Sequence, residues 1–241
     1  METVLILDFG AQYSQLIARR VREQNVYCEV KPCSISPDEI RKLAPIGIIL
    51  SGGPQSVYES VSLHVDPALF SLGVPVLGIC YGCQLMAYSL GGTVAAATEA
   101  TAREYGKTLT EFDTQSAIFH GLPASSVTWM SHGDYMEKVP EGFSLVAHSD
   151  ACPNVAICDE TRGFYGVQYH PEVNHTEFGT AMIRNFLYEV CGATGDWTMG
   201  DYMRASIESI RAKVGDGKVL LALSGGVDSS VAAALLASGV G

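Results

Sequence analysis

The segment that most constrains the fold spans residues 75–84, where an apolar run meets a cysteine and then a helical pattern. Residues 76–79 are apolar and partly β-branched, which suits a strand that is covered on both faces. Residues 83–90 have helical spacing, and two glycines follow them as a helix stop. We therefore predict a buried strand that runs directly into a helix, with Cys80 at the corner.

Two glycines frame this cysteine at the spacing of a nucleophile elbow. Gly78 and Gly82 each lie two residues from Cys80, and larger side chains would clash in so tight a turn. Such a turn exposes the sulfur at a helix N-terminus, where free N–H groups and the helix dipole favour the thiolate. The spacing therefore favours a nucleophile over a core cysteine.

The two alternative roles for Cys80 are a redox pair and a zinc site. Cys80 and Cys83 form a Cys-x-x-Cys pattern, which is typical of a redox pair. A zinc site would need two further ligands at a similar spacing, so we expect no metal.

Composition limits the class of partner. The 241 residues carry a net charge of −11, and 47% of them are hydrophobic, which is enough for a sizeable core. An acidic chain is a poor ligand for nucleic acid or anionic membranes. The seven cysteines are irregularly spaced, and we expect neither a signal peptide nor a membrane span. These features predict a reduced, cytoplasmic protein.

The first eighty residues alternate between strand and helix patterns. The expected strands are 3–9, 26–31, 46–50 and 75–79, and the expected helices are 12–24 and one that begins at Ser36. This alternation predicts an α/β fold with a mixed, mainly parallel central sheet flanked by helices. The expected core face of the first helix consists of Leu16, Ile17, Val21 and Tyr13.

Ligands of such sheets bind at the carboxyl ends of the strands, which is where Cys80 lies. The Ser-Gly-Gly-Pro loop at 51–54 ends another strand at the same edge. Its glycines leave backbone N–H groups free to approach a ligand, so the loop is a candidate for half of an oxyanion hole. The N–H of Tyr81, next to the nucleophile, would be the other half.

Residues 93–150 favour a more antiparallel region. The expected strands are 93–97, 107–112, 126–131 and 143–148. His132 falls in a turn after one of them.

A second group of reactive residues follows the expected strand 163–169. His170 and Glu172 lie two residues apart, with a stiffening proline between them. A thiol needs a base for its proton, and an imidazole needs a partner that selects its tautomer. We therefore predict a Cys80-His170-Glu172 triad. A helix over 176–190 should then close the domain, with Phe178, Met182, Phe186 and Leu187 inward.

The last fifty residues change character after a linker-like stretch at 195–198. We expect a helix over 199–213, a buried strand over 218–223, and a helix that runs to residue 238. Between the last two, residues 224–230 read Ser-Gly-Gly-Val-Asp-Ser-Ser. A glycine-rich loop between a strand and a helix is an anion-binding pattern, and this one is not a Walker loop.

Together these motifs resemble the class I glutamine amidotransferases, and within them the GMP synthetase branch. The amidotransferase signature consists of Gly78–Gln84 and Tyr169–Glu172. The features of the branch are residues 7–13, 129–134, 196–198 and 223–230. The resemblance implies a flavodoxin-like amidotransferase domain over 1–192, a linker and helix over 193–217, and a truncated ATP pyrophosphatase domain over 218–241.

The resemblance also implies roles for particular residues. Cys80, His170 and Glu172 would hydrolyse glutamine, with the N–H groups of Gly53 and Tyr81 as the oxyanion hole. The residues implied to hold glutamine are Gly52, Gln84, Ser131, His132 and Gly133. The residues implied to hold ATP are Ser224, Gly225, Gly226, Val227, Asp228, Ser229 and Ser230.

Glutamine hydrolysis would need no cofactor, whereas the whole enzyme would use ATP and Mg²⁺ to aminate XMP to GMP. We expect this chain to be a monomer and the whole enzyme a homodimer. Two alternatives remain. The domain of another synthase, such as CTP synthase or anthranilate synthase, would lack the loop at 224–230. A glutamine-binding regulatory module would bind the amino acid without turnover.

Overall fold

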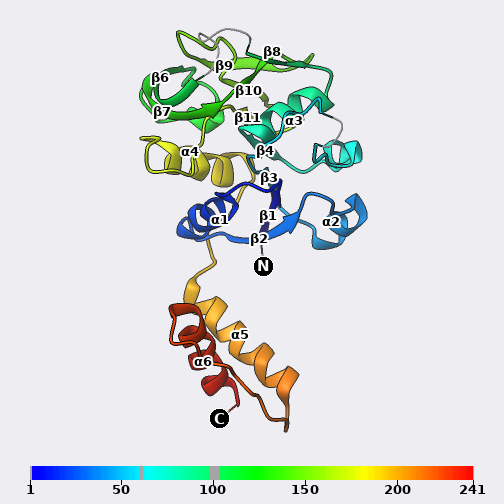
Figure 1. Cartoon of the computed structure of the whole chain (residues 1–241), viewed down its shortest axis with the longest axis vertical. Coiled ribbons are helices and arrows are strands. Elements are labelled where there is room, and N and C mark those ends of the chain that lie inside the picture. The colour runs from blue at the N-terminus through cyan, green and yellow to red at the C-terminus, as the bar shows by residue number, and fades with distance from the viewer. Residues whose placement is uncertain (1, 60–61, 98–103, 241) are drawn as a thin grey trace. The chain divides into compact units, whose positions relative to one another are not determined.

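The computed structural model describes residues 2–59, 62–97 and 104–240 (Figure 1). The chain divides into two compact units, Met1–Gly195 and Asp196–Gly241. Among the described residues, no helix is both long enough and apolar enough to cross a membrane.

A mixed sheet of nine strands forms the centre of the first unit (Figure 1). In spatial order the strands are β2 (Tyr27–Pro32), β1 (Thr3–Asp8), β3 (Gly47–Leu50), β4 (Val76–Ile79), β11 (Phe164–Val167), β10 (Ala156–Asp159), β9 (Ser144–His148), β6 (Glu104–Phe112) and β7 (Ser125–His132). The first five are parallel to one another, and the other four continue the sheet antiparallel. A separate antiparallel pair joins β5 (Thr93–Ala96) to β8 (Asp134–Lys138). The predicted mainly parallel α/β sheet and its antiparallel extension are thus confirmed.

Helices cover both faces of the parallel strands. In Figure 1, α1 (Ser14–Glu23) and α4 (Gly179–Asn185) lie on one face, and α2 (Pro37–Leu43) and α3 (Tyr81–Ser89) lie on the other. Successive strand residues point to opposite faces, so β1 supplies both cores. Val4 and Ile6 pack with α1, whereas Leu5 and Leu7 pack with α2 and α3. All four side chains are fully buried.

Local signals set several helix boundaries. The predicted helix start at Ser36 is confirmed, because Ser36 caps α2 through a reciprocal capping box with Glu39, and Pro37 is the first helical residue. The predicted helix over 176–190 begins three residues later, at Gly179, and α4 passes into a π-helical turn at Phe186–Val190. In the described part of this unit, 3₁₀ turns also occur at Pro67–Ser71 and Ala117–Phe119.

Two residues expected in the core are exposed. Tyr13 is 39% exposed and Phe178 is 37% exposed. Each precedes the first residue of its helix, because α1 begins at Ser14 and α4 at Gly179. Helical periodicity therefore does not decide where their side chains point. Strands β8 and β10 were not predicted. β8 pairs with β5, which is distant in sequence, and β10 is a short strand buried along its whole length, so it shows no alternation of apolar and polar residues.

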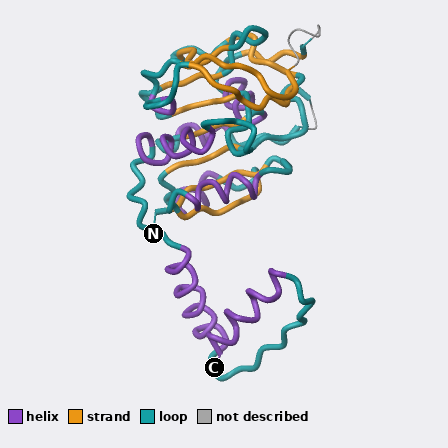
Figure 2. Tube along the Cα trace, turned by 90° about the vertical axis from the view of Figure 1, so that its left-hand side faces the viewer, coloured by secondary structure: helices purple, strands orange, loops and turns teal. Residues whose placement is uncertain are grey.

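The second unit consists of α5 (Met199–Val214), α6 (Val227–Val240) and the loop that joins them (Figure 2). The two helices pack closely at Gly239, where a Cβ atom would lie 2.7 Å from Ile210 Cγ2. The predicted buried strand over 218–223 is wrong, because these residues form no strand and Leu220 is 99% exposed. A strand needs a neighbour for its backbone N–H and C=O groups, and the described part of this unit offers two helices only.

Candidate active site

Cys80 occupies a strained backbone position between β4 and α3. Its φ of +50° and ψ of −109° are rare for a residue with a side chain and cost about 1–3 kcal/mol. Neighbouring structure enforces them. The Cys80 N–H donates to the Val167 carbonyl of β11 at 2.8 Å, and its own carbonyl accepts from the Gln84 N–H at 3.1 Å. One bond thus completes the sheet and the other begins the helix.

The glycines on either side permit this turn. A Cβ atom on Gly78 would lie 2.6 Å from the Gly82 carbonyl oxygen, and one on Gly82 would lie 2.4 Å from the Leu50 carbonyl oxygen. Both clashes are with backbone, so no side-chain movement could relieve them. The prediction that larger side chains would clash at these two positions is confirmed.

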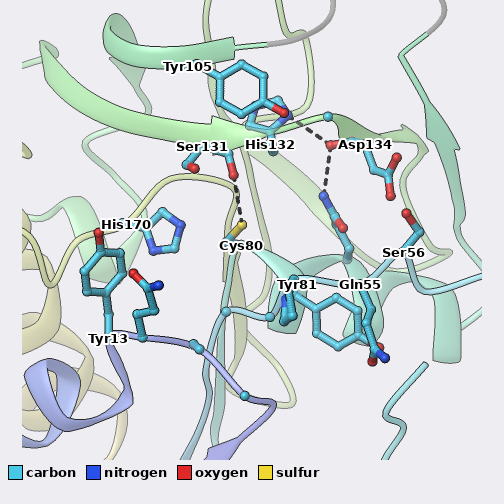
Figure 3. Close-up of a pocket in the computed structure, with 18 residues that line it drawn as sticks. Tyr13, Gln55, Ser56, Cys80, Tyr81, Tyr105, Ser131, His132, Asp134 and His170 are labelled. Atoms are coloured by element: carbon cyan, nitrogen blue, oxygen red, sulfur yellow. Dashed lines mark hydrogen bonds between the residues drawn. The ribbon is translucent and has the colours of Figure 1, made fainter. Parts of the chain in front are cut away.

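Cys80 opens into a cavity of about 600 Å³ at the carboxyl edge of the parallel strands (Figure 3). The lining residues are Gly10, Ala11, Gln12, Tyr13, Gly52, Gly53, Pro54, Gln55, Ser56, Cys80, Tyr81, Gln84, Tyr105, Ser131, His132, Gly133, Asp134 and His170. All the predicted glutamine and oxyanion residues are in this set, together with Cys80 and His170. Glu172 does not line the cavity, because it is 1% exposed and lies behind the imidazole.

His170 is held by its backbone and by one ring nitrogen. Its N–H donates to the Trp129 carbonyl of β7 at 3.1 Å, and its carbonyl accepts from the Thr176 hydroxyl at 2.7 Å. Its Nδ1 lies 2.8 Å from Glu172 Oε1. Because the carboxylate engages Nδ1, Nε2 is the nitrogen left for chemistry.

The surroundings of His170 favour the imidazolium. Burial lowers the pKa of His170, but the Cys80 sulfur and the Glu172 carboxylate outweigh burial and raise the pKa to about 10. Tyr13 contacts the ring edge-on, with ring centroids 5.8 Å apart. The triad residues predicted from sequence are therefore brought together at one site.

Ser51 holds the 51–54 loop: its hydroxyl binds the end of β1, and its carbonyl accepts from the Gly82 N–H of the elbow at 3.1 Å. The Ser51 hydroxyl accepts from the Phe9 N–H at 3.1 Å and donates to the Gly52 carbonyl at 2.9 Å. A Cβ atom on Gly52 would lie 3.2 Å from His170 Cε1, and one on Gly53 would lie 3.2 Å from the Tyr81 ring. The two predicted oxyanion positions, Gly53 and Tyr81, thus lie side by side.

Two of the predicted glutamine residues hold the turn at 131–134. Gln84 Nε2 donates to the Asp134 carbonyl at 2.9 Å, and His132 Nδ1 lies 2.9 Å from the same oxygen. Cys80 Sγ lies 3.8 Å from the Ser131 carbonyl oxygen (Figure 3). These side chains shape the cavity wall as well as line it.

Sequence reasoning missed several lining residues. Gln12 and Tyr13 follow β1 at the carboxyl edge, so the rule for parallel sheets could have found them. Asp134 lies in the 129–134 motif but was given no role, and Tyr105 comes from the antiparallel strand β6, whose sequence carries no comparable signal.

Cys83 does not share the environment of Cys80. It is fully buried, its sulfur lies 3.8 Å from Met136 Sδ, and burial raises the pKa of its thiol well above the ordinary value. In the part of the chain that the structure describes, none of the seven cysteines forms a disulfide. Among the described residues, no group of three or more His, Cys, Asp or Glu could hold a metal ion. The geometry disfavours a redox pair.

The loop at 224–230 lies in the second unit, at the N-terminus of α6. The Ser224 and Ser229 hydroxyls are 3.1 Å apart, and Ser229 donates to the Gly226 carbonyl at 3.0 Å. Gly225 has a φ of +80°, which a side chain would strain. A glycine-containing turn with hydroxyls at a helix N-terminus has the type of groups that bind phosphate.

Residues 5–190 match the family described as glutamine amidotransferase class-I. The chain belongs to the class I glutamine amidotransferase family. It is 55% identical over 240 residues to the GMP synthase (glutamine-hydrolyzing) of Clostridium botulinum strain Alaska E43 and 53% identical over 240 residues to that of Geobacillus kaustophilus. Each alignment covers 100% of this chain and 46% of the relative, so the chain spans about half the length of these curated relatives.

Solved structures agree. A GMP synthase subunit protein from Thermoplasma acidophilum superposes with a TM-score of 0.69 at 30% identity, covering 80% of this chain and 94% of that one. A glutamine amidotransferase from Thermotoga maritima has the same fold, with a TM-score of 0.63 at 19% identity, covering 80% and 99%. The predicted resemblance is confirmed, and the chain corresponds to the glutamine amidotransferase portion of GMP synthases.

Proposed function

We propose that this chain hydrolyses glutamine to glutamate and ammonia with Cys80, His170 and Glu172. The observation that carries the proposal is the shared cavity. Cys80 and His170 both line it, and Glu172 Oε1 lies 2.8 Å from the far side of the imidazole. A strained cysteine at a helix N-terminus, beside a histidine with its own carboxylate, is the arrangement of an activated nucleophile.

In the first half of the reaction, the Cys80 thiolate attacks the side-chain carbonyl carbon of glutamine. The tetrahedral oxyanion forms beside the N–H groups of Gly53 and Tyr81, which would stabilise it in place of water. The imidazolium of His170 donates its Nε2 proton to the leaving nitrogen, and ammonia departs. A γ-glutamyl thioester remains on Cys80.

The second half hydrolyses this thioester. Neutral His170 takes a proton from water as the water attacks the thioester carbonyl. The tetrahedral intermediate collapses to glutamate and the Cys80 thiolate, and the imidazolium is restored. Glu172 holds the tautomer and stabilises each imidazolium without itself taking the proton.

Asp134 is our candidate for recognition of the substrate backbone. Among the described residues that line the cavity, Asp134 is the one with a carboxylate side chain. A carboxylate can bind the α-ammonium group of glutamine. Gly52, Gln84, Ser131, His132 and Gly133 would complete the glutamine site.

In the whole synthase, ammonia would aminate an ATP-activated XMP to give GMP. The residues that would hold the ATP phosphates and Mg²⁺ are Ser224, Gly225, Gly226, Val227, Asp228, Ser229 and Ser230. Bound Mg²⁺ would neutralise phosphate charge. We also propose the domain division at 192 and 217, a monomeric chain, a homodimeric whole enzyme and a cytoplasmic location, the last supported by seven free cysteines.

A glutamine-mimicking diazo-ketone followed by peptide mapping tests the proposal. This reagent needs only a formed pocket and a reactive thiolate. We expect one adduct on Cys80 that glutamine blocks and that Cys80→Ala abolishes, and ammonia release from glutamine by the same preparation. Glutamine-protected labelling without ammonia release would favour the binding module, and an adduct on Cys83 would overturn the assignment.

A further inference from the structure

Arg20 joins α1 to the loop that carries the triad carboxylate. Its Nε donates to the backbone carbonyl of Glu172 at 2.9 Å. Its Nη2 donates to Asn174 Oδ1, and its Nη1 pairs with Glu23 Oε2 at 2.9 Å. The guanidinium thus uses all three nitrogens, two of them toward the segment that follows His170.

The arginine itself is well anchored. Its side chain is 15% exposed, and the neighbouring α1 residues Ile17 and Val21 are fully buried against the sheet. Arg19 makes a useful contrast. It pairs with the same Glu23 at 2.9 Å, but its side chain is 73% exposed. Exposed ion pairs contribute little to stability, so the structure distinguishes the buried Arg20 from the exposed Arg19.

Two separate clamps therefore hold the two triad residues of this segment. The backbone of His170 is bound by Trp129 and by Thr176. The carbonyl of Glu172 is bound by Arg20 from α1. The distance between His170 Nδ1 and Glu172 Oε1 is 2.8 Å, and small shifts of the Glu172 main chain would lengthen this distance.

We infer that Arg20 is a positioning residue for glutamine hydrolysis, which holds Glu172 in reach of His170 by binding the Glu172 carbonyl. This role rests on the proposed function. Arg20 does not touch the cavity that contains Cys80, so it should affect the rate of the covalent step and leave glutamine affinity unchanged.

The test measures diazo-ketone labelling of Cys80 in the 241-residue chain, as maximal rate and as half-saturating concentration. For Arg20→Met, we expect the maximal rate to fall about 10-fold or more, because misplacement by about 1 Å can cost up to about 100-fold. The half-saturating concentration should stay unchanged. Arg20→Lys should recover part of the rate, since an ammonium can still reach the carbonyl. Arg19→Met is the matched control and should behave as the unmodified chain.

A double-mutant cycle separates positioning from general damage. In a Glu172→Ala background, Arg20→Met should have little further effect, because no carboxylate is left to position. Additive losses, an equal loss in Arg19→Met, or a raised half-saturating concentration at unchanged rate would each overturn the role of Arg20. Absence of labelling in the unmodified chain would instead overturn the proposed function, and the role of Arg20 with it.

Discussion

Gly82→Ala should displace the nucleophile by a predictable distance. Gly82 is the second residue of α3, and its N–H donates to the Ser51 carbonyl at 3.1 Å. A Cβ atom there would lie 2.4 Å from the Leu50 carbonyl oxygen, where ordinary contact begins at 3.4 Å. The start of α3 must therefore move from β3 by about 1 Å.

Two consequences follow from this movement. Overpacking against the backbone should cost about 1–3 kcal/mol of stability. A shift of about 1 Å in the position of Cys80 should slow labelling by up to about 100-fold. Alanine would add up to about 1 kcal/mol of helix propensity, which matches only the lower end of the overpacking cost, so the labelling rate is the decisive measurement.

Gly200→Ala is the matched control, because Gly200 is the second residue of α5. A Cβ atom on Gly200 would lie 3.6 Å from Thr198 Oγ1, which is an ordinary van der Waals contact. This variant should keep the labelling rate. Urea unfolding and diazo-ketone labelling of both variants provide the measurement. If Gly82→Ala labels within two-fold of the unmodified chain and loses less than about 0.5 kcal/mol, the account of the elbow is wrong.

Three further predictions concern the cavity and its surroundings. Cys83→Ser should keep labelling of Cys80 but lose about 1–3 kcal/mol of stability, because a hydroxyl would be buried among apolar groups. Asp134→Asn should raise KM for glutamine with little change in kcat, since it removes a substrate contact rather than a reacting group. The raised pKa of His170 stabilises the fold below pH 6.5, and that contribution is lost as the pH rises to about 10. Glu172→Gln should lower the pKa of His170, so the free energy of unfolding should fall less steeply as the pH rises.

A specific result would contradict each of these three predictions. Loss of Cys80 labelling in Cys83→Ser would revive the redox pair. An unchanged KM in Asp134→Asn would remove the carboxylate from substrate recognition. For Glu172→Gln, urea unfolding at several pH values between 6.5 and 10 is compared with the unmodified chain. Parallel curves would show that the carboxylate does not support the imidazolium.

The short-range features of the site were predictable because their causes lie within a few residues. The Gly-x-Cys-x-Gly spacing dictates a tight strand-to-helix turn, and the observed φ of +50° at Cys80 follows from it. His170 and Glu172 are neighbours in sequence, so their pairing needs no long-range information. Alternation of strands and helices likewise predicted the parallel half of the sheet.

Contacts between distant segments were decided only by tertiary structure. Asp134 enters the cavity because β8 pairs with β5, and Arg20 binds the Glu172 carbonyl across 152 residues of sequence. The same limit explains the error at 218–223, where an apolar run predicts a strand but only a neighbouring strand can satisfy its backbone. Local sequence determines conformation where one residue constrains the next, whereas burial, pairing and pKa depend on which surfaces the folded chain brings together.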